Sequence, residues 1–155
     1  MTSTHPGSAH GPGASQASRA ALTAEEIARA FSGHQFRAAY PFLADAVTWD
    51  IAGAERLDGR EAVIAACESS AAYLSEAKTE FRRFRVLGGA DWVVIDSLAE
   101  YTDPDHATSV VASCDIYRFT DGMLAEITSY NIGLNEPDRP SVDRTSADVA
   151  RGGSA

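Results

Sequence analysis

The chain has 155 residues and a formal net charge of −9, so its length fits one domain and its charge is strongly acidic. Proteins that bind nucleic acids or anionic membrane surfaces normally present a basic face, which argues against both as partners. The sequence contains no apolar run long enough for a signal core or for the about 20 residues of a membrane span. We therefore expect a cytoplasmic protein whose partner is a small molecule or another protein.

Both ends of the chain have the composition of disordered tails. Residues 1–20 are rich in Ser, Gly, Ala, Pro and Thr, with Met1 as their single large hydrophobic residue. Residues 136–155 contain prolines and end in Gly-Gly-Ser-Ala. Such segments cannot bury enough apolar surface to offset the entropy of ordering. One domain is therefore expected over residues 21–135, which is long enough to form its own core.

The first half of this domain has mainly helical patterns. Thr23 and Glu26 match a capping box in front of an apolar stripe that includes Ile27 and Phe31, which predicts a helix over residues 23–32. The elements predicted after it are a short helix over 35–43, a β-prone segment over 46–51 and a long helix over 60–77.

The second half has the pattern of successive strands separated by turn residues. The predicted strands cover residues 79–87, 92–101, 107–119 and 123–134, and the turn between the last two is Asp121-Gly122. Helices followed by a run of strands are typical of an α+β fold.

Asp115 is the most informative polar residue of the sequence. Both faces of its strand are largely apolar, so the strand is expected to be central in the sheet and covered on both sides. An isolated ionised carboxylate would be costly there, so it must be paired, hydrogen-bonded, protonated or solvated by a cavity. The alternative interpretation is a structural carboxylate that accepts bonds from a neighbouring hydroxyl or from Arg118.

Several segments together resemble the nuclear transport factor 2 superfamily, and most of all its ketosteroid isomerases and SnoaL-like polyketide cyclases. These segments are residues 46–50 (Ala-Val-Thr-Trp-Asp) and 57–63 (Leu-Asp-Gly-Arg-Glu-Ala-Val), together with the order of the strands. The resemblance covers about residues 24–133. It implies a cone in which a curved mixed, mostly antiparallel sheet packs against N-terminal helices and encloses a pocket. It also implies a homodimer formed through the outer face of the sheet.

Two acids match the carboxyl pair of the isomerases. The resemblance puts Asp50 at the position of the general base and Asp115 at that of the second, protonated carboxyl. Two departures are equally clear. Glu26 stands where the isomerases have an oxyanion-hole tyrosine, and Ser129 stands where related epoxide hydrolases have an aspartate. Neither of those two reactions is therefore matched in full.

The same alignment implies which side chains line the pocket. Together with the two acids, these pocket residues are Trp49, Ser97, Ser113, Tyr117, Ser129 and Asn131. A shift of one residue in the register of a strand would turn the pocket residues of that strand to the outer face of the sheet. His34, which follows Gly33, is interpreted as a surface histidine. No pair of His or Cys residues has the spacing of metal ligands, so we expect neither a metal nor a cofactor.

Two functions remain open. The first is a cofactor-free enzyme in which Asp50 is the base and Asp115 the protonated donor or second acid–base group. Its reaction would be isomerisation, aldol-type cyclisation or epoxide or hydroxyl addition on a hydrophobic carbonyl-containing, polyketide-like or terpenoid-like substrate. The second is a non-catalytic small-molecule-binding or dimerisation module, since this fold hosts both. Carboxylates that open into one cavity favour the enzyme, whereas carboxylates on different faces favour the binder.

Overall fold

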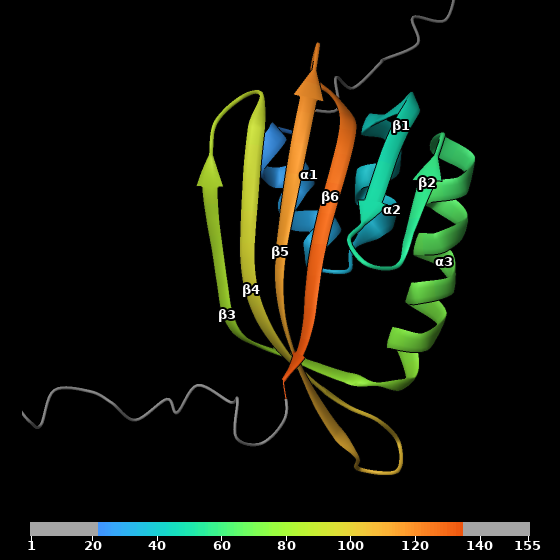
Figure 1. The fold of residues 1–155 in the computed structure, drawn as a ribbon, viewed down its shortest axis with the longest axis vertical. Helices are drawn as coiled ribbons and strands as arrows, with labels where there is room; N and C mark the ends of the chain where they lie inside the picture. The colour runs from blue at the N-terminus through green and yellow to red at the C-terminus, as the bar shows by residue number, and fades with distance from the viewer. Residues whose placement is uncertain (1–21, 135–155) are drawn as a thin grey trace, which may run out of the picture.

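The computed structural model describes residues 22–134, and the predicted tails at 1–20 and 136–155 lie outside these described residues. Four helical segments are found, in chain order α1 (Ala24–Ser32), α2 (Phe36–Ala39), the 3-10 turn η1 (Tyr40–Phe42) and α3 (Arg60–Glu76). The strands are β1 (Leu43–Ile51), β2 (Glu55–Asp58), β3 (Lys78–Gly88), β4 (Trp92–Thr102), β5 (Thr108–Thr120) and β6 (Met123–Leu134) (Figure 1). The α+β prediction is confirmed.

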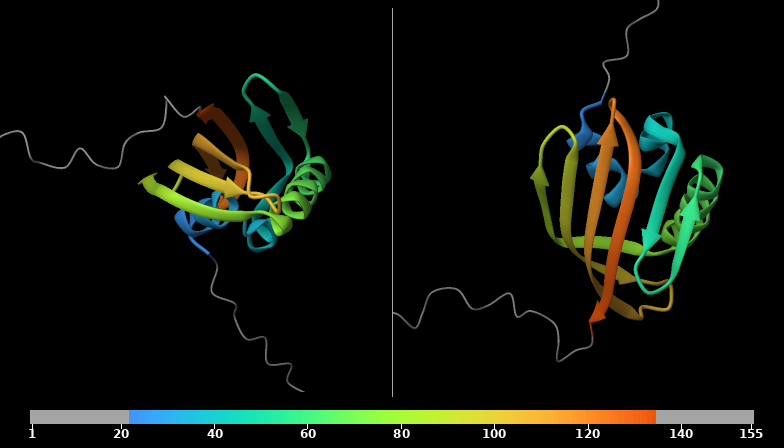
Figure 2. Two further views of the ribbon diagram at one scale, coloured as in Figure 1. Left: turned by 90° about the horizontal axis from the view of Figure 1, so that it is seen from below. Right: turned by 45° about the horizontal axis from the view of Figure 1, so that its top comes forward.

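The six strands form one curved sheet in the order β2-β1-β6-β5-β4-β3. Neighbouring strands are antiparallel except for β1 and β6, which run parallel, so the sheet is mixed and mostly antiparallel as expected. Figure 2 shows α1 and α2 on one side of this sheet and α3 alongside β1 and β2. We call the face of the sheet that packs against α1 the inner face.

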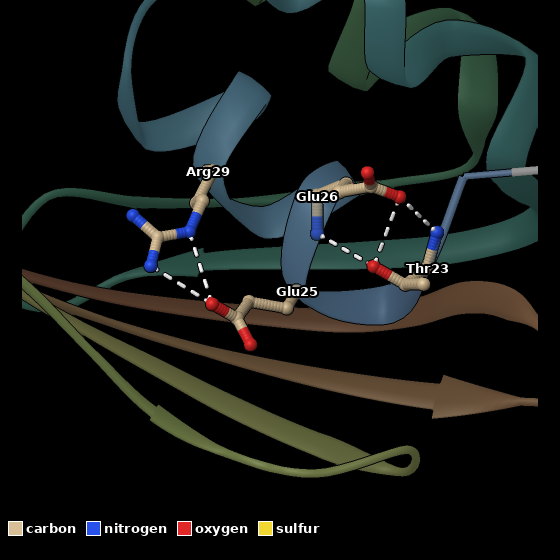
Figure 3. A network of polar contacts seen from close by, with 4 residues as sticks. All are labelled: Thr23, Glu25, Glu26 and Arg29. Carbon is tan, nitrogen blue, oxygen red and sulfur yellow. Dashed lines mark hydrogen bonds and ion pairs between the residues drawn. The ribbon is translucent and has the colours of Figure 1, made fainter.

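The N-terminal helix begins as its sequence predicts. The Thr23 hydroxyl accepts a hydrogen bond from the Glu26 backbone N–H at 3.2 Å, and the Glu26 carboxylate accepts one from the Thr23 N–H at 2.8 Å (Figure 3). This reciprocal capping box satisfies two backbone donors that the first turn leaves free. Glu26 is exposed and occupied by the cap, so it does not enter the interior at the position where the isomerases have a tyrosine.

Two segments differ from the prediction. Pro41 has no backbone N–H and clashes with a preceding carbonyl in an α-helix, so the chain passes from α2 into the 3-10 turn η1 and begins β1 already at Leu43. The segment before α3, for which no strand was predicted, forms the short strand β2, whose Asp58 pairs with Thr48. Gly53, with φ of 79°, allows the tight connection between the two strands.

The core fills the space between α1, α3 and the inner face. Its largest fully buried side chains include Ile27, Leu43, Ile95, Tyr117, Leu124 and Ile127. On the opposite, outer face of the sheet four large apolar side chains are exposed: Leu87, Trp92, Tyr130 and Ile132. No helix within residues 22–134 is long and apolar enough to cross a membrane.

Candidate functional site

A cavity of about 530 Å³ lies between the inner face of the sheet and α3. This volume falls within the usual range for small-molecule sites. Its lining comes from the α1–α2 junction and from α3, β1, β4, β5 and β6: His34, Phe36, Trp49, Ser69, Ser70, Tyr73, Leu74, Tyr101, Ser109, Val111, Ser113 and Asn131. A smaller chamber of about 100 Å³ shares five of these residues, so the two spaces are adjacent, and Asp115 and Ser97 line the smaller one.

Strand register places the expected pocket residues on one face. On β5 and β6 the paired residues are Ser113 with Asn131, Asp115 with Ser129, and Tyr117 with Ile127. Partners across a ladder project from the same face, and the next residue on each strand projects from the other. Ser113 and Asn131 therefore line the cavity, whereas Ser129 and Tyr117 are buried behind and beside Asp115.

Asp115 accepts two short hydrogen bonds from hydroxyl groups. Ser32 Oγ on α1 donates to Oδ2 at 2.7 Å, and Ser129 Oγ on β6 donates to Oδ1 at 2.6 Å. Each serine has one further partner. Trp49 Nε1 donates to Ser129 Oγ at 2.9 Å, and the Tyr117 hydroxyl lies 2.6 Å from Ser32 Oγ. Four side chains from α1, β1, β5 and β6 thus converge on one carboxyl group.

The direction of these bonds follows from counting protons. An indole N–H can only donate, so Ser129 accepts from Trp49 and keeps its own proton for Asp115. The Tyr117 hydroxyl is fully buried with Ser32 as its hydrogen-bond partner, so it donates to Ser32, which then donates to Asp115. The two serine protons therefore point toward the carboxylate oxygens, and the Trp49 and Tyr117 protons point toward the serine oxygens, an arrangement that suits the ionised form of Asp115.

Burial works in the opposite direction. Desolvation raises the pKa of Asp115 above its ordinary value, and the hydrogen bonds from Ser129 and Ser32 lower that pKa only in part. Among residues 22–134 no basic side chain forms an ion pair with Asp115. The result is a largely buried carboxyl group that lines the smaller chamber without a counter-charge and is held by neutral donors.

Asp50 lies on the other side of the sheet. Trp49 reaches the interior, where its ring packs edge-on against Phe31 at 5.2 Å, and the next side chain along β1 points to the outer face. Asp50 is accordingly exposed, and it lines neither chamber. The structure does not bring the two predicted acids together.

His34 is the residue that the sequence interpretation missed. It is partly buried and lines both chambers, with Tyr101 Oη 3.5 Å from its Nε2. Burial lowers the pKa of His34, so its imidazole is neutral near pH 7. The sequence offered only an indirect signal for a buried position. His34 lies between Phe31 and Phe36, two aromatic residues that are both buried. Within residues 22–134 no group of His, Cys, Asp and Glu side chains is arranged to hold a metal ion.

Comparisons with known proteins agree with this architecture. A family model described as the SnoaL-like domain matches residues 24–127. A solved nuclear transport factor 2-like protein of unknown function from Cytophaga hutchinsonii is 31% identical, with a TM-score of 0.61 over 68% of this chain and 93% of that one. No protein of curated function matches the sequence.

Two further solved structures share the fold at lower identity. A proposed polyketide cyclase from Xanthomonas campestris is 19% identical, with a TM-score of 0.55 over 67% of this chain and 83% of that one. An LEH-like epoxide hydrolase from M. tuberculosis is 13% identical, with a TM-score of 0.51 over 67% of this chain and 75% of that one. At these identities the likeness extends to the fold alone.

Proposed function

Because the chain belongs to the SnoaL-like domain family of the nuclear transport factor 2-like superfamily, we propose that it is a cofactor-free enzyme acting on a hydrophobic small molecule. The substrate binds in the inner-face cavity and exchanges a proton with Asp115. The reaction class is isomerisation, aldol-type cyclisation or epoxide or hydroxyl addition. The substrate is a carbonyl-containing, polyketide-like or terpenoid-like compound.

The observation that carries this proposal is the environment of Asp115. It is the single charged side chain among the described residues that line the two chambers, and aromatic rings surround the space in front of it. Because burial raises its pKa, the ionised carboxyl is a stronger proton acceptor than an ordinary surface aspartate. A carboxylate with four lone-pair sites, two of them used by serines, can still accept a proton from a ligand.

This assignment gives Asp115 the role of base that the resemblance assigned to Asp50. A carboxylate on the outer face has no path to a ligand bound against the inner face, since general bases act within hydrogen-bond reach. Asp115 takes the proton from carbon next to a carbonyl group and returns it to the same or a conjugated carbon. Ser32 and Ser129 hold the carboxyl in place during both transfers.

Deuterium exchange tests the proposal without knowledge of the natural substrate. The α-protons of 1-tetralone and 2-tetralone, two bicyclic ketones, are followed by NMR in D₂O. We expect wild-type protein to exceed the buffer rate, Asp115→Asn to lose about 100-fold or more, and Asp50→Asn to stay within about twofold. Equal losses in both variants, or wild-type exchange that Asp115→Asn leaves intact, would contradict the assignment.

A second candidate function is a non-catalytic pocket protein, and the position of Asp50 on the outer face favours it. In that case Asp115 is a structural carboxylate that orders Ser32 and Ser129. The same samples separate the two functions. A binder alters the NMR signals of the added ketones without accelerating their exchange, and Asp115→Asn then changes stability alone.

A further inference from the structure

The imidazole of His34 is held against the cavity by aromatic rings. Its ring centroid lies 5.9 Å from that of Phe36, 5.5 Å from that of Phe81 and 6.0 Å from that of Tyr101. These neighbours come from α2, β3 and β4, so the position of the imidazole is fixed from three sides. His34 and Asp115 also line the same small chamber.

The backbone at His34 is in the left-handed region, with φ of 64°. A glycine would adopt this conformation freely, whereas a side chain adds strain, and such strain tends to collect at functional sites. His106 has nearly the same φ of 65°, but it is exposed in the loop between β4 and β5. The positive φ is therefore no sign of function by itself, and His106 provides a matched control.

The pair of His34 and Tyr101 offers one hydrogen-bond donor to the cavity in either tautomer. A neutral imidazole and a phenol together carry two exchangeable protons, and the contact between Nε2 and Oη uses one of them. If Tyr101 donates, the proton on His34 Nδ1 remains, and if His34 donates, the Tyr101 hydroxyl proton remains. Burial raises the pKa of Tyr101, so the phenol keeps its proton at neutral pH.

This donor complements Asp115. The proton count around Asp115 makes its carboxyl an acceptor, and the chamber that it lines also contains His34 and Tyr101. Removal of a proton next to a carbonyl group leaves negative charge on the carbonyl oxygen, which a fixed donor stabilises. The tyrosine that supplies this donor in the isomerases is absent, and capped, exposed Glu26 occupies its sequence position.

We propose that the His34–Tyr101 pair binds the carbonyl oxygen of the ligand while Asp115 removes the neighbouring proton. The C–H bond breaks, its proton passes to the carboxylate, and its electron pair forms the enolate, whose oxygen accepts the hydrogen bond from the pair. Asp115 then returns the proton to a conjugated carbon, which completes an isomerisation. In an aldol-type closure the enolate carbon instead bonds to a second carbonyl carbon of the ligand, the π bond of that carbonyl group breaks toward its oxygen, and Asp115 returns the proton to the resulting alkoxide. The ligand is thus an enolisable ketone with a hydrophobic body.

This inference rests on the proposed function, and its test compares two asparagine variants. His34→Asn removes the imidazole but keeps a residue that tolerates the left-handed backbone, and His106→Asn makes the same change in the exposed loop. We expect His34→Asn to lower the rate of ketone exchange by about 100-fold or more, and His106→Asn to stay within about twofold. Tyr101→Phe, which removes only the hydroxyl, should lower the exchange rate as well.

Binding is measured in parallel with 2-naphthol, a planar mimic of an enol. In wild-type protein this probe should shift the imidazole NMR signals of His34 and leave those of His106 unchanged, a readout that does not depend on whether a variant folds. One outcome would overturn this inference alone: Asp115→Asn abolishes the exchange, whereas His34→Asn and Tyr101→Phe leave the exchange rate intact. Absence of both exchange and probe binding in wild-type protein would overturn the proposed function, and this inference with it.

Discussion

Replacing Ser129 with alanine removes two hydrogen bonds at once. Ser129 is 3% exposed, accepts from the Trp49 indole at 2.9 Å and donates to Asp115 at 2.6 Å. The variant leaves the indole N–H without its acceptor and one carboxylate oxygen without its donor. The cost of the first loss is independent of pH, whereas the cost of the second depends on whether Asp115 is ionised.

The magnitudes follow from these two bonds. An unpaired buried donor costs about 1–3 kcal/mol, and a lost hydrogen bond to a charged group about 1.5–3 kcal/mol. Because the pKa of Asp115 is higher in the folded chain than in the unfolded chain, wild-type stability falls as pH rises through that interval and then levels off. The Ser129 bond lowers that pKa, so its removal raises the pKa further. The cost of Ser129→Ala should therefore grow from about 1–3 kcal/mol near pH 4 to about 2.5–6 kcal/mol near pH 8.

Urea denaturation at both pH values, at one fixed protein concentration, measures the difference. Ser113→Ala is the matched control, because Ser113 also faces the cavity but donates to the neutral Asn131 side chain at 2.8 Å. We expect this control to cost about 1 kcal/mol or less at either pH. A cost of Ser129→Ala that is equal at the two pH values, or larger near pH 4, would refute the account of Asp115.

Two further predictions concern the surface and the ends of the chain. The protein should form a homodimer through the outer sheet face, because four large apolar side chains would otherwise be exposed there. In light scattering, Ile132→Glu should give monomers. The control Tyr73→Glu should remain a dimer, because Tyr73 is similarly exposed but lies on α3. A monomer mass for wild-type protein at micromolar concentration would contradict this. Deleting residues 1–20 and 136–155 should shift Tm by less than about 2 °C, since their composition offers little apolar surface to bury. A larger decrease of Tm in calorimetry would show that a terminal segment contributes to the core.

The fold was predictable where local signals agree with tertiary packing. Thr23 and Glu26 specify the start of α1 through contacts within one turn, and the Asp121-Gly122 turn joins β5 to β6, with φ of 51° and 77° at its two residues. The start of β1 was not predictable, because the apolar positions from Phe36 to Leu43 fit a helix until Pro41 interrupts it. The strand β2 was not predictable either, because its conformation comes from pairing with β1 and not from local propensity.

The candidate site was predictable only in part. Strand alternation placed Ser113 and Asp115 on one face of β5, and the family resemblance placed Asn131 on the same face of the sheet, because long strands paired in register leave their side chains only two directions. The place of His34 in the site was not predictable, because the direction of its side chain depends on a left-handed backbone at a helix end. No spacing of apolar residues encodes that conformation. The donor role of Tyr101 likewise depends on its contact with His34, 67 positions away in the sequence.

The hydrogen bond from Trp49 to Ser129, which orients Ser129 toward Asp115, also explains why Asp50 does not face the cavity. Trp49 can reach Ser129 only if its side chain faces inward, and fully buried Val47, two positions earlier on β1, faces inward as well. Turning Asp50 inward would turn Val47 and Trp49 outward, and each buried apolar side chain of this size contributes about 1.5–3 kcal/mol. Among residues 22–134, Asp115 is therefore the one acid that lines the two chambers. Any charge that Asp115 creates on a ligand must be stabilised by a neutral donor, and within the smaller chamber the His34–Tyr101 pair is placed to supply it.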